Sequence, residues 1–172
     1  MNPILAPIFS RRCIRKYQNK PVAPALIQDA LEAAMAAPSA RACDPWEVLV
    51  VQRPEILGQM AAGLPSGKML AGASVGFVVC GDLQRANGQL LSFLLQDCAA
   101  FTENLLLALS MLGLGGVWIG VHPREDRMDH LKKLFRLPEN VVPVGVVAAG
   151  YPDEAQPPRT RFDAARVHRE QW

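Results

Sequence analysis

Basic side chains gather near the start of the chain, where the stretch SRRCIRKY at residues 10–17 holds Arg11, Arg12, Arg15 and Lys16. A run of this kind usually forms a solvated face of a protein. Arginine is also the side chain best suited to holding a phosphate group through paired hydrogen bonds. A second basic pair, Arg159 and Arg161, lies near the other end of the chain. If the two groups converge in space they form a clamp for an anion, and at this level both interpretations stay open.

Other patterns that bind nucleotides or metals are incomplete in this sequence. GLGG at 113–116 lacks the third glycine of a dinucleotide-binding turn and follows a predicted helix, not a strand. GLPSGKM at 63–69 has one residue too few between its glycines for a phosphate-binding P-loop, and Met69 stands where Ser or Thr must hold magnesium. No Cys/His metal spacing and no GxSxG motif is present, so we expect no metal site. A Ser-His-Asp triad assembled from distant residues stays open.

The composition is that of an ordinary folded protein. The 172 residues are half apolar and 20% charged, which predicts one domain, residues 1–172, with a sizeable core. A net charge of +2 is too small for a general nucleic-acid or membrane-surface binder. The four cysteines have no CxxC spacing and are expected to be reduced thiols. Because MNPILAPIFSRR does not read as a signal peptide, we expect a cytoplasmic protein.

The apolar pattern predicts helices and strands in alternation. Helices are predicted at residues 3–9, 23–38, 54–64, 89–112 and 124–137. Strands are predicted at residues 47–52, 73–82, 116–121 and 141–151. This order indicates an α/β or α+β fold with a central sheet of about four or five strands, whose order stays open. Residues 105–112, LLLALSML, are apolar all round, so we expect burial on every side, in part against a second subunit.

Longer stretches of the chain resemble the nitroreductase family of FMN proteins. The resemblance is carried, in order, by FSRRCIRKY, AAMAAPSARACDPWEVLVV, QDCAAFTENLLLALSMLGLGGVWIG and VVPVGVVAAGYPDEAQPPRTRFDAARVH. Together these segments cover most of the 172 residues. The resemblance implies an α+β fold with a mostly antiparallel central sheet flanked by helices. It also implies a domain-intertwined homodimer with FMN bound in the subunit interface.

The resemblance assigns roles to individual residues. The early phosphate-and-ribityl motif matches Arg11, Arg12, Cys13 and Arg15. The late basic residues that close on the phosphate match Arg159 and Arg161. The loop that packs on the flavin, usually from the other subunit, matches Pro38, Ser39 and Ala40. The segment whose backbone donors approach the reactive N5 edge of the ring matches Ile119, Gly120 and Val121.

Three positions depart from the family pattern. Ala42 stands where an Asn often binds the pyrimidine edge of the flavin, Asp44 where Gln is common, and Cys13 where Ser is usual. A carboxylate at position 44 that points toward the ring would disfavour the anionic reduced flavin and lower its reduction potential.

The function implied is that of an FMN-dependent oxidoreductase. It takes hydride from NADH or NADPH onto flavin N5 and passes electrons to a nitroaromatic, quinone or similar acceptor in a ping-pong cycle. No separate catalytic side chain is expected, because the flavin carries the chemistry. Two alternatives stay open: a flavin-binding module without turnover, and a dimeric scaffold without cofactor. The physiological acceptor and the choice between NADH and NADPH are not predicted.

Overall fold

The computed structural model describes residues 2–172 and is built on a four-stranded antiparallel sheet with the strand order β1-β2-β4-β3. The strands are β1 (Trp46–Val51), β2 (Val75–Asp82), β3 (Gly115–Gly120) and β4 (Val141–Gly150). In the centre of the sheet, Val78 pairs with Leu49 on one side and with Val146 on the other. The expected α+β class with a mostly antiparallel sheet is therefore confirmed.

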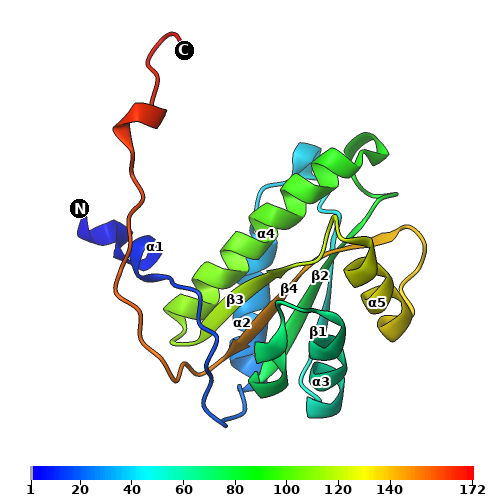
Figure 1. The fold of residues 1–172 in the computed structure, drawn as a ribbon. Coiled ribbons are helices and arrows are strands. Elements are labelled where there is room, and N and C mark those ends of the chain that lie inside the picture. The colour runs from blue at the N-terminus through cyan, green and yellow to red at the C-terminus, as the bar shows by residue number, and fades with distance from the viewer. Residues whose placement is uncertain (1) are drawn as a thin grey trace.

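Helices cover both faces of this sheet (Figure 1). One face carries α2 (Pro24–Met35) and α4 (Leu91–Met111), and the other carries α3 (Pro54–Gly63) and α5 (Glu125–Phe135). Alternate residues of β2 point to opposite faces, so that Phe77 belongs to one core and Val78 to the other. Burial on both faces explains why β2 is an almost unbroken apolar run.

Local sequence signals account for the helix ends. Pro24 and Pro54 open α2 and α3, where a residue without an N–H loses no hydrogen bond. Gly113, with a φ of 76°, follows the end of α4 in the left-handed conformation that glycine adopts at low cost. The predicted helix at 3–9 is instead a 3-10 turn, Pro3–Leu5, followed by α1 (Ala6–Ser10).

The burial expected for residues 105–112 is incomplete within one chain. Leu105 and Leu109 are fully enclosed, but Leu107 is only partly buried and Met111 is 69% exposed. Within residues 2–172, none of the helices has the combined length and hydrophobicity needed to cross a bilayer.

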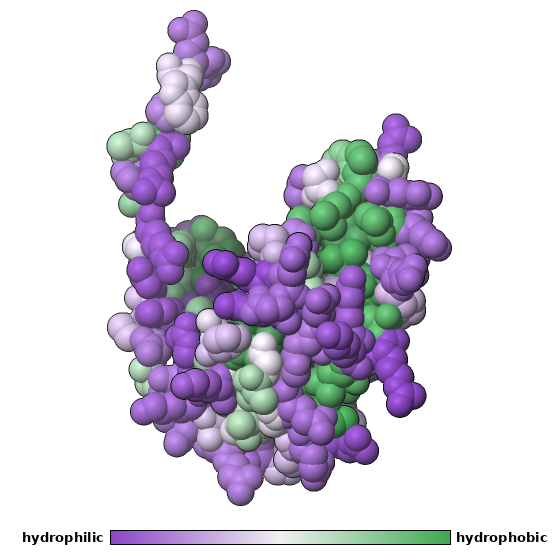
Figure 2. All heavy atoms as spheres, turned by 45° about the vertical axis from the view of Figure 1, so that its right-hand side comes forward, coloured by the Kyte–Doolittle hydropathy of each residue, from purple (hydrophilic) through white to green (hydrophobic). Residues whose placement is uncertain are grey.

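The first and last segments of the chain lie side by side at one edge of the molecule (Figure 1). The backbone N–H of Arg159 donates to the carbonyl of Phe9 at 2.9 Å, and residues 156–172, which include Arg159, form an exposed arm. The arm contains a 3-10 turn, Ala164–Arg166. Figure 2 shows this arm standing apart from the body of the molecule and largely hydrophilic.

Candidate functional site

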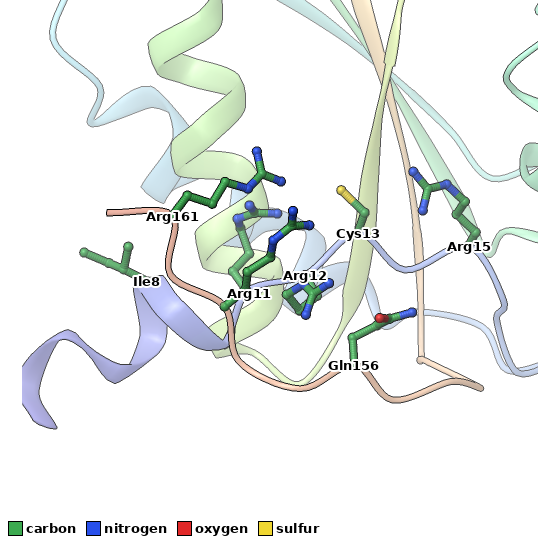
Figure 3. A pocket seen from close by; sticks show the side chains of 8 residues that line it. Ile8, Arg11, Arg12, Cys13, Arg15, Gln156 and Arg161 are labelled. Carbon is green, nitrogen blue, oxygen red and sulfur yellow. The ribbon is translucent and has the colours of Figure 1, made fainter. Parts of the chain in front are cut away.

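The two basic groups at opposite ends of the sequence meet in one cavity of about 430 Å³. The cavity is lined by Ile8, Arg11, Arg12, Cys13, Arg15, Gln156, Arg159 and Arg161. Figure 3 shows the guanidinium groups of Arg11 and Arg161 turned toward the same space, with Cys13 between Arg11 and Arg15. All six residues that the sequence assigns to the phosphate end therefore lie around a single hollow.

The sheet holds the first of these segments in place. Cys13 forms a parallel bridge with Gly116 at the start of β3, and the N–H of Ile14 donates to the Gly116 carbonyl at 3.0 Å. The neighbouring Gly115 permits this approach, because a Cβ there would lie 2.7 Å from the Cβ of Ile14. Gly113, the first glycine of the GLGG stretch, thus follows the end of α4. Gly115, the second, leaves room for the segment that carries the early arginines.

Glu154 joins the two basic segments. Its Oε1 accepts the backbone N–H groups of Arg15 at 2.5 Å and Lys16 at 3.1 Å. These hydrogen bonds, that from Arg15 foremost, lower the pKa of the Glu154 carboxyl below its ordinary value. The Arg12 guanidinium also donates to the carbonyl of Pro157. Sequence reasoning missed Glu154 and Gln156, and the one signal for them was their place in the family-like segment at 141–168.

The cavity carries far more positive than negative charge. Among residues 2–172, one ion pair reaches it, between Arg11 Nε and Glu103 Oε1 at 3.5 Å, and the Glu103 side chain is half exposed. Five arginines with so little neutralisation match an anion that has several negatively charged oxygens. A phosphate monoester fits this set of donors. Among the described residues, no three His, Cys, Asp or Glu side chains gather as metal ligands.

The predicted flavin-packing loop lies outside the arginine cavity of its own chain and has a conformation of its own. Arg41, Ala42 and Asp44 have φ values of 56°, 52° and 45°, in the left-handed region that residues other than glycine rarely adopt. The N–H of Asp44 donates to Ser39 Oγ at 3.0 Å, and the Ser39 hydroxyl donates to the Asp44 carboxylate. The Asp44 side chain is therefore engaged by its own loop.

Asp97 in α4 ties this loop to the body of the protein. Its Oδ1 accepts the N–H of Ala40 at 2.9 Å. Asp97 itself is 4% exposed. No sequence pattern connects these two residues, which lie 57 positions apart.

The third predicted segment is the end of β3. Ile119 and Val121 are buried, whereas Gly120 is exposed and a Cβ on it would meet nothing within 4 Å. The N–H of Val121 donates to the Val144 carbonyl at 3.3 Å, so this donor is engaged within the sheet region. Arg127 Nη1 in α5 donates to the Gly120 carbonyl at 2.7 Å. The end of β3 is therefore open at Gly120, and the Gly120 carbonyl is held by the Arg127 side chain.

The cysteines and tryptophans divide by burial. Cys13 is exposed in the cavity and Cys43 is half-buried in the loop, whereas burial raises the pKa of both the Cys80 and the Cys98 thiol to about 12. Trp46 is buried and its ring lies 5.7 Å from that of Phe101, so it is a core residue. Trp118, on the edge strand, is 36% exposed.

Comparison with known proteins gives consistent matches along the chain. The family model described as Nitroreductase family matches residues 8–64 and 58–151. A Methanothermobacter thermautotrophicus protein, provisionally named an NADH dehydrogenase/NAD(P)H nitroreductase, is 43% identical over 171 residues, which cover 98% of this chain and 87% of that protein.

Solved structures agree over the full length. A Bacteroides thetaiotaomicron crystal structure under the same provisional name has a TM-score of 0.93 and 40% identity, and the match covers 100% of this chain and 99% of that one. A structure from Desulfovibrio desulfuricans, provisionally named a nitroreductase and solved in complex with FMN, has a TM-score of 0.84 and 28% identity, covering 100% and 99%.

Proposed function

Because the chain belongs to the nitroreductase family, we propose that it is an oxidoreductase that binds FMN, takes hydride from NADH or NADPH and passes electrons to a nitroaromatic, quinone or similar acceptor. The observation that carries this proposal is the meeting of arginines from both ends of the sequence in one cavity. A cofactor ending in a phosphate monoester supplies the anion that such a cavity needs. We take residues 1–172 as a single cofactor-binding domain.

Each predicted segment has a distinct task in this proposal. The arginines hold the phosphate, and their positions are maintained by Glu154 and by the start of β3. The loop at 38–40 packs on the ring, and the exposed Gly120 leaves room for a flat group to lie against the strand end. When bound, FMN supplies the hydride-accepting and electron-donating chemistry. The protein's contribution is to bind the cofactor and to orient its ring.

The proposal includes a homodimer and a ping-pong cycle. A second copy is supported by apolar side chains that one chain leaves uncovered, among them Ile4, Met111 and Phe162 at 82%, 69% and 78% exposure. The exposed arm carries Arg161 into the cavity and extends away from the body, as expected of a segment that packs on a partner (Figure 1). With both substrates using one exposed ring face, the nicotinamide leaves before the acceptor binds.

Absorbance spectroscopy tests the function directly. The purified protein, incubated with FMN and desalted, is expected to retain a yellow flavin that bleaches when NADH or NADPH is added anaerobically and recovers when a quinone or nitroaromatic follows. A yellow protein that neither nicotinamide bleaches would indicate a flavin-binding module without turnover. A colourless protein that ignores added FMN would indicate a scaffold. Light scattering on the same sample measures whether the protein is a dimer.

A further inference from the structure

Asp97 is a carboxylate almost completely enclosed by protein. It is 4% exposed in α4, and only one of its oxygens has a partner, the N–H of Ala40. The other oxygen, Oδ2, is buried and meets no donor among residues 2–172. Burying a carboxylate with an unpaired oxygen costs folding free energy. An apolar residue would pack here at lower cost, so packing alone does not account for Asp97.

What Asp97 holds is the loop between α2 and β1. Within the loop, Ser39 and Asp44 bond to each other, and three residues adopt the left-handed conformation at a cost in free energy. In the described part of the chain, the bond from Ala40 to Asp97 is the one hydrogen bond that joins residues 38–44 to another element. Without it, no hydrogen bond among residues 2–172 would hold the strained loop against α4.

We propose that Asp97 is a positioning residue for the flavin ring, acting through the backbone of Ala40. This rests on the proposed function, in which residues 38–40 pack on the ring. Because Asp97 does not line the arginine cavity, its influence is confined to the ring end of the cofactor site. Loss of the bond therefore weakens binding of any ligand that has the ring, whether or not it has a phosphate.

Riboflavin, which shares the ring of FMN and lacks the phosphate, makes this testable. Fluorescence titration measures the dissociation constants of both ligands for the wild type and for Asp97→Ala and Asp97→Asn. The alanine variant is expected to bind both ligands about tenfold more weakly, the size of one hydrogen bond to a charged group. The asparagine variant restores both affinities, because its amide oxygen accepts the same N–H. Asp129→Ala, an exposed aspartate in α5, is the control and changes neither.

A second variant removes the donor instead of the acceptor. Ala40 opens a short 3-10 turn and follows an extended Ser39, so Ala40→Pro fits the backbone while deleting the N–H. It is expected to weaken the binding of both ligands about as much as Asp97→Ala does. The double variant is expected to weaken binding no more than either single variant. If thermal melting shows that Asp97→Ala does not fold, Ala40→Pro decides the question by itself.

The outcomes separate the two proposals. A wild type that binds neither ligand overturns the proposed function. A wild type that binds both, with Asp97→Ala or Ala40→Pro unchanged or weakened for FMN alone, overturns the role of Asp97 and leaves the function standing. Loss of both affinities in Asp97→Asn also overturns it, because the acceptor is retained.

Discussion

The two ends of the proposed cofactor site are built in contrasting ways. The arginine cavity is formed by segments near the chain termini, is exposed, and is held by backbone hydrogen bonds to Glu154 and Gly116. The backbone at Ala40 and Gly120, which we propose lies against the ring, is fixed by charged side chains that reach out of helices, Asp97 and Arg127. Each of these two side chains also buries one polar atom that has no partner among residues 2–172.

The difference follows from what each end must do. Attraction between several guanidinium groups and a phosphate falls off slowly with distance, so the cavity tolerates small movements of its parts. Hydride transfer requires the reacting atoms to approach within about 3.5 Å in a defined orientation, so the ring end needs backbone that does not shift. In the proposed site, exposed charge serves the first task, and side chains that anchor the backbone and each bury one polar atom serve the second.

The largest expected effect distinguishes the two ends of the proposed cofactor site, because it changes the affinity for FMN and leaves that for riboflavin unchanged. Replacing Arg11 and Arg161 together by alanine is expected to weaken FMN binding about a hundredfold, because two charge-assisted hydrogen bonds are lost. Riboflavin affinity stays unchanged. Fluorescence titration measures both, and Arg169→Ala, on the exposed arm outside the cavity, is the matched control. An equal loss of riboflavin affinity would show that these arginines do not act on the phosphate.

Substitution of Arg127 tests the end of the site that is proposed to hold the flavin ring. Arg127→Ala removes the donor that fixes the Gly120 carbonyl, and we expect stopped-flow reduction by NADH or NADPH to slow about tenfold through misplacement of the strand end. FMN affinity changes little, because the arginine cavity and the loop at 38–40 that is proposed to pack on the ring are both intact. Arg124→Ala, exposed and just before α5, is the control, and Arg127→Lys is expected to recover part of the rate. An unchanged reduction rate in Arg127→Ala would show that Gly120 does not lie where hydride is transferred.

The strained loop offers a stabilising change. Ala42 has a φ of 52°, which asparagine adopts more readily than alanine, so Ala42→Asn is expected to raise the melting temperature by about 2 °C. The same substitution at Ala36, an exposed residue with a φ of −77°, gains nothing. Calorimetry of the two variants measures the difference. A lower melting temperature for Ala42→Asn would show that the loop does not carry this strain in solution.

The smallest expected effect comes from the link between the basic segments. The folded state lowers the pKa of Glu154, so its contribution to stability is present at neutral pH and is lost as the pH falls below 4.5 through the lowered pKa. Glu154→Gln is therefore expected to melt about 1 °C lower at pH 7, a small shift because solvent screens this exposed group. Melting curves at several pH values should converge under acidic conditions. A difference that grows on acidification would contradict the assignment.

Much of the fold was predictable because its signals are local. The apolar run of β2, the prolines that open α2 and α3, and the glycine after α4 each act within a few residues. The strand order was not predictable, since it depends on how distant strands pair. Nor was the left-handed conformation of Arg41, Ala42 and Asp44, because none of them is a glycine.

The site was predictable to a different degree at its two ends. Arginine indicates anion binding by its residue type, so the five arginines of the cavity were predictable, whereas Gln156 was not. The anchors of the ring end carry no such signal: Asp97 lies in an apolar helix and Arg127 in an ordinary amphipathic one. Their partners are backbone atoms, which no residue type reveals, and Ala40 lies 57 positions from Asp97.

The four cysteines differ in burial, and the two accessible ones can be used to measure ligand binding. Cys80 and Cys98 stay protonated and enclosed at neutral pH, so a maleimide dye reaches only Cys13 and Cys43. Cys13 lies in the arginine cavity and Cys43 in the strained loop. Shielding of each sulfur by added ligand, read by mass spectrometry, would follow occupancy at both halves of the site without any engineered label.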